Sequence, residues 1–483
     1  MDRLSTLDAE FLHLEDGIAH MHIAGACVFA DPPPPFADVE ALIASKLHLI
    51  PRYRQRVRSV PLELGRPVWT DDPHFELGYH LRHTALPAPG DDAAFCRLMG
   101  RLMSSPLDRE RPLWEAWLVE GLAGGHWALV FKLHHCMVDG IAGVELLTVL
   151  LDPEPHASIG SPEPWEPDPE PDGATKVLDA WVGLAGDVIA TARQIPHAVV
   201  HPVDTLRTAV GTAQGIARFA TDLRSTPPLS IEGTIGPHRA WAHSSASLGD
   251  VRTIRSVFGG TINDVVLTSI AGGYRELLIS RGEDPDVAVV RSMVPVSMRH
   301  DDGEGVPDNR VSTLLYDLPV NIADPVERLN LVREQMAELK GSHMAEVGEA
   351  ITTLGNLAPP MVVGPLTRVA IRAMHQLPQR AINTVTTNVP GPQFPLYCLG
   401  REMLEYRPYV PISHGVRIGT AILSYNGHLC FGITGDYATA RDVGVIASAA
   451  STGIEQLRQR ALAPQRRARS RTTTRKSAPR KRG

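Results

Sequence analysis

The chain has 483 residues, of which 43% are apolar, 21% charged and 5% aromatic. At about 150 residues per domain, this length predicts three domains or two large ones, and the composition excludes a disordered or fibrous protein. The five cysteines are scattered and form no CxxC pair, which argues against a disulfide framework and a zinc cluster. The first eight residues carry acids where a signal peptide needs basic and then apolar residues, and no run of about 18 uncharged apolar residues follows. We therefore expect a cytoplasmic protein that does not span a membrane.

The net charge of −7 combines two regions of opposite sign. Nine Lys and Arg residues and no acid follow Pro464, and without them 38 basic residues face 54 acidic ones, a charge of −16. The acidic body disfavours nucleic acid as a partner. The basic tail is expected either to be a disordered, solvating extension or to attract the protein to an anionic lipid surface.

Two compositional breaks divide the chain. Residues 152–172 contain seven Pro and seven acids, which predicts an exposed, extended linker, and residues 224–236 are rich in Ser, Thr, Pro and Gly. Between them, residues 175–223 have apolar side chains at helical spacing, which predicts either a helical hairpin that covers the core or an amphipathic surface that docks on lipid. The predicted regions are an N-terminal subdomain (1–151), a linker with a helical connector (152–236), a C-terminal subdomain (237–463) and a disordered basic tail (464–483).

The predicted elements mix strands and helices in both halves, so the fold class is α/β in the broad sense that includes α+β. Residues 127–133 form a short apolar run typical of a strand, and a loop over 134–140 and an apolar helix over 141–151 follow it. In the second half, 265–281 predicts a helix and 287–294 a buried strand. Residues 419–434, with Asn-Gly at 426–427, predict a β-hairpin with a two-residue turn.

Two adjacent histidines, His134 and His135, stand at the end of the predicted strand and are followed by Asp139-Gly140. Neighbouring side chains on a strand face opposite sides, so only one of the two rings enters a given cavity, and the spacing does not suit a metal site. An imidazole at this place could remove a proton from an alcohol or thiol, whereas the alternative is a hydrogen-bonded structural pair. Asp139 could orient the imidazole or brace the loop through an Arg, and Gly140 would let the chain turn. The sequence contains no GxSxG motif, which argues against a serine hydrolase.

The motif HHCMVDG resembles the HHxxxDG motif of the bacterial wax ester synthase/acyl-CoA:diacylglycerol acyltransferase family, a branch of the HxxxD acyltransferases. The resemblance extends to about residue 462 and rests on an ordered set of segments. These are LSTLDAEFL (4–12), RPLWE (111–115), NDVVL (263–267), VPVSMR (294–299), NVPGP (388–392) and the stretch 432–437. The resemblance implies a chloramphenicol acetyltransferase-like fold, with two subdomains of mixed sheets around a central channel.

The resemblance also implies roles for individual residues. His135 would be the general base, His134 a supporting residue, and Asp139 a brace of the loop, with Arg299 as its candidate partner. Asn263 would stabilise the oxyanion, although Asn is also a common helix N-cap. Residues at the substrate would be Gly140, Trp114, Asn388, Pro390 and Gly391, and Trp114 is alternatively a core aromatic.

The function implied by the resemblance is transfer of a long-chain acyl group from acyl-CoA to diacylglycerol or a fatty alcohol. No metal or other cofactor is expected, because the thioester supplies the leaving group and acyl-CoA is a substrate. The enzyme would lie in the cytoplasm, at the inner membrane face or on lipid bodies. Two alternatives remain: a condensation-type or polyketide-associated acyltransferase that uses a carrier-bound thioester, and an inactive lipid-binding or droplet-coating paralogue.

Overall fold

A computed structural model provides the structure of the chain. It describes residues 2–30, 32–61, 64–137, 147–155, 159–179, 181–182, 228–297, 311–341 and 382–476. The predicted helix over 141–151 and the connector over 175–223 are therefore described only in part, and residues 147–150 and 173–179 are helical. Asp139, Gly140 and Arg299 lie outside the described residues.

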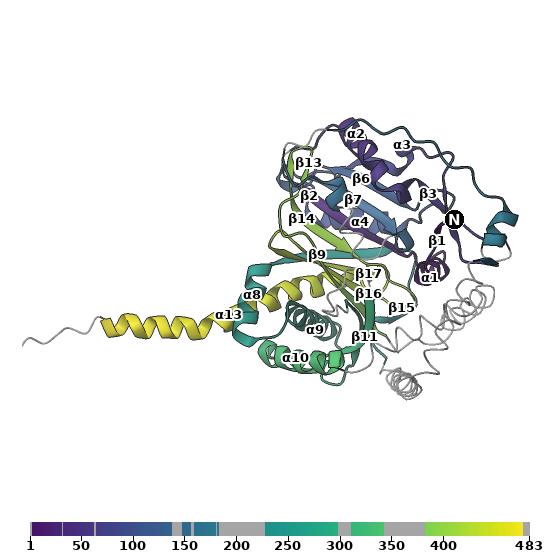
Figure 1. Ribbon diagram of the computed structural model, residues 1–483. Coiled ribbons are helices and arrows are strands. Elements are labelled where there is room, and N and C mark those ends of the chain that lie inside the picture. The colour runs from purple at the N-terminus through teal and green to yellow at the C-terminus, as the bar shows by residue number, and fades with distance from the viewer. Residues whose placement is uncertain are drawn as a thin grey trace, which may run out of the picture.

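The first of two six-stranded sheets has the order β13-β14-β2-β7-β6-β5 (Figure 1). Its strands are β2 (His22–Phe29), β5 (Leu81–Ala85), β6 (Trp114–Glu120), β7 (Trp127–His134), β13 (Tyr397–Cys398) and β14 (Arg401–Tyr409). Strands β5 and β6 are parallel and the other neighbours are antiparallel. Every residue of β7 is buried, which agrees with the apolar run that predicted this strand.

The second six-stranded sheet has the order β11-β10-β12-β16-β17-β9. Its strands are β9 (Arg239–Ser247), β10 (Val290–Ser297), β11 (Val311–Leu318), β12 (Thr384–Pro390), β16 (Ile418–Tyr425) and β17 (His428–Asp436). Strand β12 is parallel to β10 and β16, so this sheet is also mixed. The predicted hairpin is confirmed as β16 and β17, and Asn426 and Gly427 have the positive φ values of 42° and 80° that a type I′ turn needs.

Helices and short elements complete the two halves. The helices are α1 (Thr6–Leu14), α2 (Phe36–Lys46), α3 (Leu77–His80), α4 (Asp92–Ser104), α8 (Leu248–Phe258), α9 (Ile262–Ser280), α10 (Pro325–Gly341) and α13 (Gly444–Lys476). The short strands are β1 (Asp2–Arg3), β3 (Gln55–Arg58), β4 (Val68–Asp71), β8 (Glu232–Gly233) and β15 (Gly415–Val416). Helix α9 packs with the start of α13 against the second sheet, and its predicted apolar face (Val266, Ile270, Tyr274 and Leu277) is fully buried. None of the described helices is both long and apolar enough to cross a bilayer.

The C-terminal half contributes two strands to the first sheet, which a boundary at residue 237 does not capture. After β12 the chain crosses to the first sheet, where β14 pairs with β2 from Ala24 to Phe29, and then it returns to the second sheet as β16. Glycine is required where the halves touch, because a Cβ at Gly432 would lie 1.7 Å from the carbonyl oxygen of Pro408. Strands β13 and β14 therefore belong to the N-terminal sheet although they lie within the predicted C-terminal subdomain.

Three further expectations can be compared with the structure. Residues 159–172 form no helix or strand and are mostly exposed, and Arg56 Nη2 on β3 donates to Glu170 Oε2 at 2.8 Å. The strand expected at 287–294 is shifted to Val290–Ser297, and Val287, at the expected start, lies in a turn and is 70% exposed. The tail expected to be disordered from residue 464 is instead helical to Lys476, and α13 projects away from the body (Figure 1). The helix begins in the core, where Ile454, Leu457 and Ala461 are buried, and Ala, Arg and Gln beyond it are strong helix formers that oppose the cost of Pro464 and of the three threonines at 472–474.

Candidate active site

The histidine motif begins at the end of β7, a strand in the middle of the first sheet. The backbone N–H of His134 donates to Leu113 O at 2.9 Å, and the N–H of His135 donates to Met21 O at 2.8 Å. His135 begins a short 3-10 turn, η5 (His135–Met137). Segments on both sides of β7 thus fix the backbone of both histidines, and Leu113 belongs to the PLW sequence singled out above.

The two imidazoles have different environments, as expected for neighbours at a strand end. His134 is fully buried, whereas His135 is partly exposed. The ring of His135 stacks on that of Phe11, with 3.9 Å between centroids and 24° between planes. Phe11 lies on α1, whose first turn is capped by Ser5 through a hydrogen bond from the N–H of Asp8. The N-terminal LSTLDAEFL segment therefore forms a helix that supports the His135 ring.

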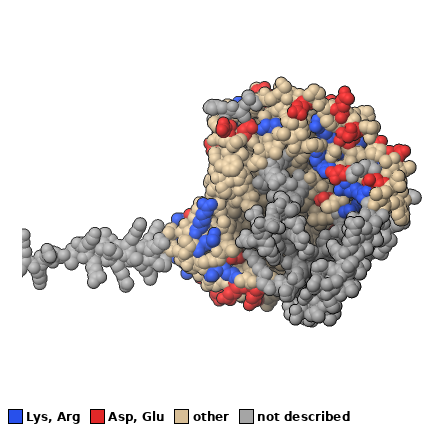
Figure 2. All heavy atoms as spheres, viewed as in Figure 1, with Lys and Arg blue, Asp and Glu red and all other residues tan. Residues whose placement is uncertain are grey.

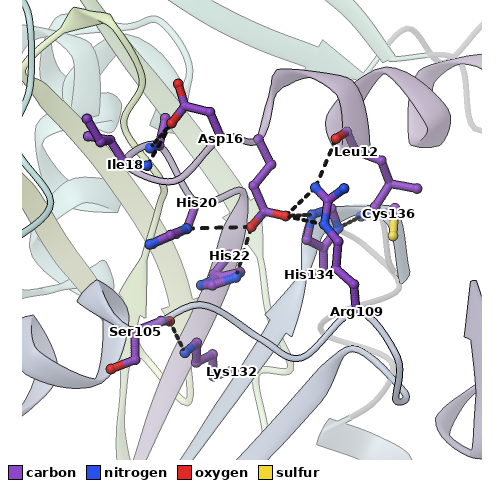
Figure 3. Close-up of polar contacts among 12 residues, drawn as sticks. Leu12, Asp16, Ile18, His20, His22, Ser105, Arg109, Lys132, His134 and Cys136 are labelled. Atoms are coloured by element: carbon purple, nitrogen blue, oxygen red, sulfur yellow. Dashed lines mark hydrogen bonds and ion pairs between the residues drawn. The ribbon is translucent and has the colours of Figure 1, made fainter.

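A buried carboxylate that the sequence did not single out lies beside the histidines, and Figure 3 labels its partners His20, His22, His134 and Arg109. Glu15 follows α1, and its side chain is only 9% exposed. Its oxygens lie 3.8 Å from His20 Nδ1, 3.3 Å from His22 Nε2 and 3.5 Å from His134 Nε2. Arg109 donates to the same carboxylate through Nη2 at 2.5 Å and Nε at 3.0 Å. Four segments of the chain meet at this carboxylate.

Burial and these contacts determine the charges in the cluster. Burial raises the pKa of Glu15, but the close contacts with His134 and His22 and the hydrogen bonds from Arg109 outweigh it and hold this pKa far below its usual value. Burial lowers the pKa of His22 to about 3, and Glu15 only partly offsets that effect. The pKa of His20 is also lowered, chiefly by burial. Near neutral pH, Glu15 is therefore ionised while His20 and His22 are uncharged.

A buried lysine lies next to the cluster. Lys132 on β7 has no exposed surface, and its Nζ donates to the carbonyl oxygens of Leu102 at 3.0 Å and Ser105 at 2.6 Å, at the end of α4. Burial lowers its pKa to about 8. Because a cation at the C-terminal end of a helix is stabilised by the free carbonyls, Lys132 fastens β7 to the segment that leads to Arg109.

The structure separates the two interpretations of Asn263. Thr261, not Asn263, caps α9, since Thr261 Oγ1 accepts from the N–H of Asp264 and Asp264 Oδ2 accepts from the N–H of Thr261. The N-cap interpretation of Asn263 is therefore wrong. Asn388 on β12 donates from Nδ2 to Asn263 Oδ1 at 3.3 Å, so two predicted site residues from distant segments are in contact.

The other predicted substrate residues are packed against the protein. Trp114 is 2% exposed, donates from Nε1 to Tyr53 O at 2.8 Å and stacks on His80. This environment favours a core role for Trp114 over substrate binding. Pro390 ends β12, and a Cβ at Gly391 would lie 2.3 Å from Ser424 O, so the NVPGP segment lies close against β16.

Solved structures define the class of this fold. A wax ester synthase/diacylglycerol acyltransferase from Marinobacter aquaeolei VT8 matches with a TM-score of 0.67 and 24% identity, over 95% of this chain and 99% of that one. The first condensation domain of the calcium-dependent antibiotic synthetase matches with a TM-score of 0.57 and 15% identity, over 96% and 97% of the two chains. The fold is thus that of the chloramphenicol acetyltransferase-like acyltransferases and condensation domains.

Sequence comparison gives the family. The model of the wax ester synthase/diacylglycerol acyltransferase catalytic domain matches residues 4–266, and that of the WS/DGAT C-terminal domain matches residues 308–458. A probable diacylglycerol O-acyltransferase, tgs1, of Mycobacterium tuberculosis is 37% identical over 461 residues, 95% of this chain and 96% of the relative. The chain belongs to the wax ester synthase/diacylglycerol acyltransferase family, as its motifs predicted.

Within the described part of the chain, no group of three or more His, Cys, Asp or Glu side chains is arranged to hold a metal ion. Sequence reasoning found the histidine pair but missed Glu15, Arg109, His20 and His22. The signal that could have indicated them is weak: His20 and His22 alternate at the start of a strand, whereas Glu15 and Arg109 stand among other charged residues in loops.

The stacked pair of Phe11 and His135 gives a first prediction. Phe11→Ala removes the ring contact, which is worth about 0.5 to 1.5 kcal/mol, so we expect the turnover number of acyl transfer to fall about two- to tenfold. The measurement is steady-state kinetics with a labelled acyl-CoA. Leu7→Ala, at a position on the same helix that is 57% exposed, is the control and should keep the wild-type rate. A Phe11→Ala enzyme as fast as the control would show that the stacking does not support the reaction.

Proposed function

We propose that this chain transfers a long-chain acyl group from acyl-CoA to the hydroxyl of diacylglycerol, and also to a fatty alcohol, with His135 as the general base. The observation that carries the proposal is the position of His135: a partly exposed imidazole, presented by a fully buried strand and braced by Phe11, in a chain of this family. The products are triacylglycerol and wax ester.

The reaction follows from the chemistry of the imidazole. A neutral His135 removes the proton from the acceptor hydroxyl as its oxygen attacks the thioester carbonyl carbon. The C–O bond forms, the carbonyl π electrons move to oxygen, and the tetrahedral intermediate then breaks the C–S bond. The thiolate of CoA leaves and takes from the imidazolium the proton that the acceptor hydroxyl gave up. The protein supplies no nucleophile of its own in this scheme, and the thioester supplies the leaving group, so the proposed reaction needs no cofactor.

Asn263 is the proposed donor to the oxyanion. Because Asn388 donates to Asn263 Oδ1, the amide nitrogen of Asn263 keeps its two hydrogens for another acceptor. An amide donor aimed at a developing oxyanion is worth about 3 to 4 kcal/mol. The proposed role of Asp139 is to maintain the loop that follows His135, with Arg299 as its partner. The proposed role of Gly140 is to let that loop turn.

The acceptor lipids are insoluble, which makes peripheral contact with the membrane or with lipid bodies part of the proposal. The helical residues 173–179 and 181–182 pack Val177 against Val60 and Val68, but leave Leu178, Trp181 and Val182 exposed by 66%, 50% and 64%. On the face drawn in Figure 2, the described acidic and basic side chains are interspersed over the body. The excess of basic residues instead lies in the sequence after Pro464, of which α13 includes the part up to Lys476.

Two alternatives make different predictions about the donor and about turnover. A condensation-type enzyme would prefer an acyl group carried on a protein thioester, and an inactive lipid-binding paralogue would bind substrates without turnover. Identity of 37% over nearly the whole chain to a probable diacylglycerol O-acyltransferase favours the CoA-dependent enzyme over both.

The central prediction concerns His135→Ala. Loss of a general base lowers the rate about 10²- to 10⁴-fold, so the variant should have almost no activity with palmitoyl-CoA and either diolein or hexadecanol. His428→Ala, which changes an exposed histidine at the start of β17, is the matched control and should be fully active. A folded His135→Ala protein that retains the wild-type rate would refute the assignment of the base.

A second prediction concerns the lipid surface. A chain that ends at Pro464 lacks nine basic residues, each worth up to about 1 kcal/mol near an anionic surface, so it should co-sediment more weakly with anionic vesicles at low salt. Trp181→Ser should weaken binding to anionic and zwitterionic vesicles alike. Val287→Ser, at an exposed apolar position of the C-terminal half, is the control. Binding equal to that of the full chain would remove the tail from the proposal.

A further inference from the structure

The carboxylate of Glu15 is the point where the segments around the catalytic histidines meet. It contacts His134 at the end of β7, His22 at the start of β2 and Arg109 in the loop before β6. His22 and His134 are also direct partners in the β2–β7 register. Contacts from several segments to one buried carboxylate restrict the orientations of the rings that face it.

The hydrogen bonds around His134 determine which of its nitrogens carries the proton. The backbone N–H of Cys136 donates to His134 Nδ1 at 3.1 Å, so Nδ1 is an acceptor. In a neutral imidazole the other nitrogen then carries the hydrogen, and Nε2 faces Glu15 Oε2. An ionised carboxylate only accepts hydrogen bonds, so Glu15 favours this tautomer and disfavours its alternative.

The same tautomer holds the turn that carries His135. Cys136 is the second residue of η5, and its N–H is satisfied by the His134 ring. If Nδ1 carried the proton, two N–H groups would face each other and the first peptide of the turn would have to move. The position of the His135 ring over Phe11 therefore depends on which nitrogen of the neighbouring, fully buried His134 ring carries the proton.

Arg109 is the cationic partner of the buried carboxylate. Its guanidinium donates twice to Glu15 and once to Leu12 O, at 2.9 Å, so it also ties the end of α1 to the cluster. Without Arg109, the carboxylate loses the donor that fixes its position, and its contact with His134 is no longer held.

We infer that Glu15, held by Arg109, is a positioning residue for acyl transfer: it keeps His134 in the Nε2–H tautomer and thereby orients the turn that carries His135. The inference rests on the proposed role of His135 as the base. It assigns to Glu15 the orienting role that sequence reasoning offered to Asp139, and it assigns to Arg109 the role of charge partner.

The experiment compares Glu15→Gln, Glu15→Asp, Arg109→Gln and Arg109→Lys in steady-state kinetics with palmitoyl-CoA and diolein. Glu15→Gln keeps the size of the side chain but can present a donor to His134 Nε2. We expect kcat to fall about 10- to 100-fold, while KM for either substrate changes less than about threefold. Glu15→Asp should recover part of kcat, and Arg109→Lys should retain more than Arg109→Gln.

Glu455→Gln breaks an exposed carboxylate–arginine pair on α13 and is the matched control, with wild-type kinetics expected. A folded Glu15→Gln enzyme with wild-type kcat overturns the inference. If Glu15→Gln does not fold, equal activity of Arg109→Lys and Arg109→Gln at the wild-type level overturns it instead. The proposed function fails separately: an active His135→Ala enzyme refutes the base, whereas an inactive one beside a fully active Glu15→Gln refutes only the role of Glu15.

Discussion

One buried carboxylate determines how the catalytic end of this fold is built. Glu15 is almost completely withdrawn from water, and a carboxylate at such depth persists only when donors surround it. Its partners come from the start of β2, from the end of β7 and from the loop before β6, while Glu15 itself follows α1, so satisfying one charge brings four segments together. The ring of His134, the turn after it and the position of His135 are consequences of that arrangement.

The second half of the molecule holds the same segment from the other side. Arg239 at the start of β9 is buried, and its Nη2 donates to Ile18 O in the turn after Glu15. Asp16, next to Glu15, accepts from the N–H groups of Ile18 and Ala19, both at 2.7 Å, and contacts His414 at 3.1 Å. Together with the crossing of β14 into the first sheet, these contacts make the site a product of both halves. A cut at residue 237 therefore divides the sequence but not the structure.

Local patterns predicted what depends on local physics. The apolar run of β7, the helical face of α9 and the Asn-Gly turn of the β16–β17 hairpin all follow from periodicity and turn chemistry, and the motif at 134–140 predicted the family and suggested the proposed base. Glu15 and Arg109 could not be predicted in this way, because they are 94 residues apart and neither lies in a pattern. Asn388, the partner of Asn263, could likewise not be predicted, because the pairing of β12 with β16 determines where Asn388 lies. The helical end of α13 was missed because composition describes the charge of the tail but not its continuity with a helix begun in the core.

The most direct measurement of the central claim is the protonation of His134 in the folded enzyme. Nitrogen-15 NMR of imidazole-labelled protein at pH 7, with the His134 signals assigned by their loss in His134→Gln, distinguishes the two neutral tautomers and the cation. We expect a proton on Nε2 and an unprotonated Nδ1 in the wild type, and loss of this single tautomer in Glu15→Gln. A wild-type His134 that is protonated on Nδ1, or on both nitrogens, would contradict it.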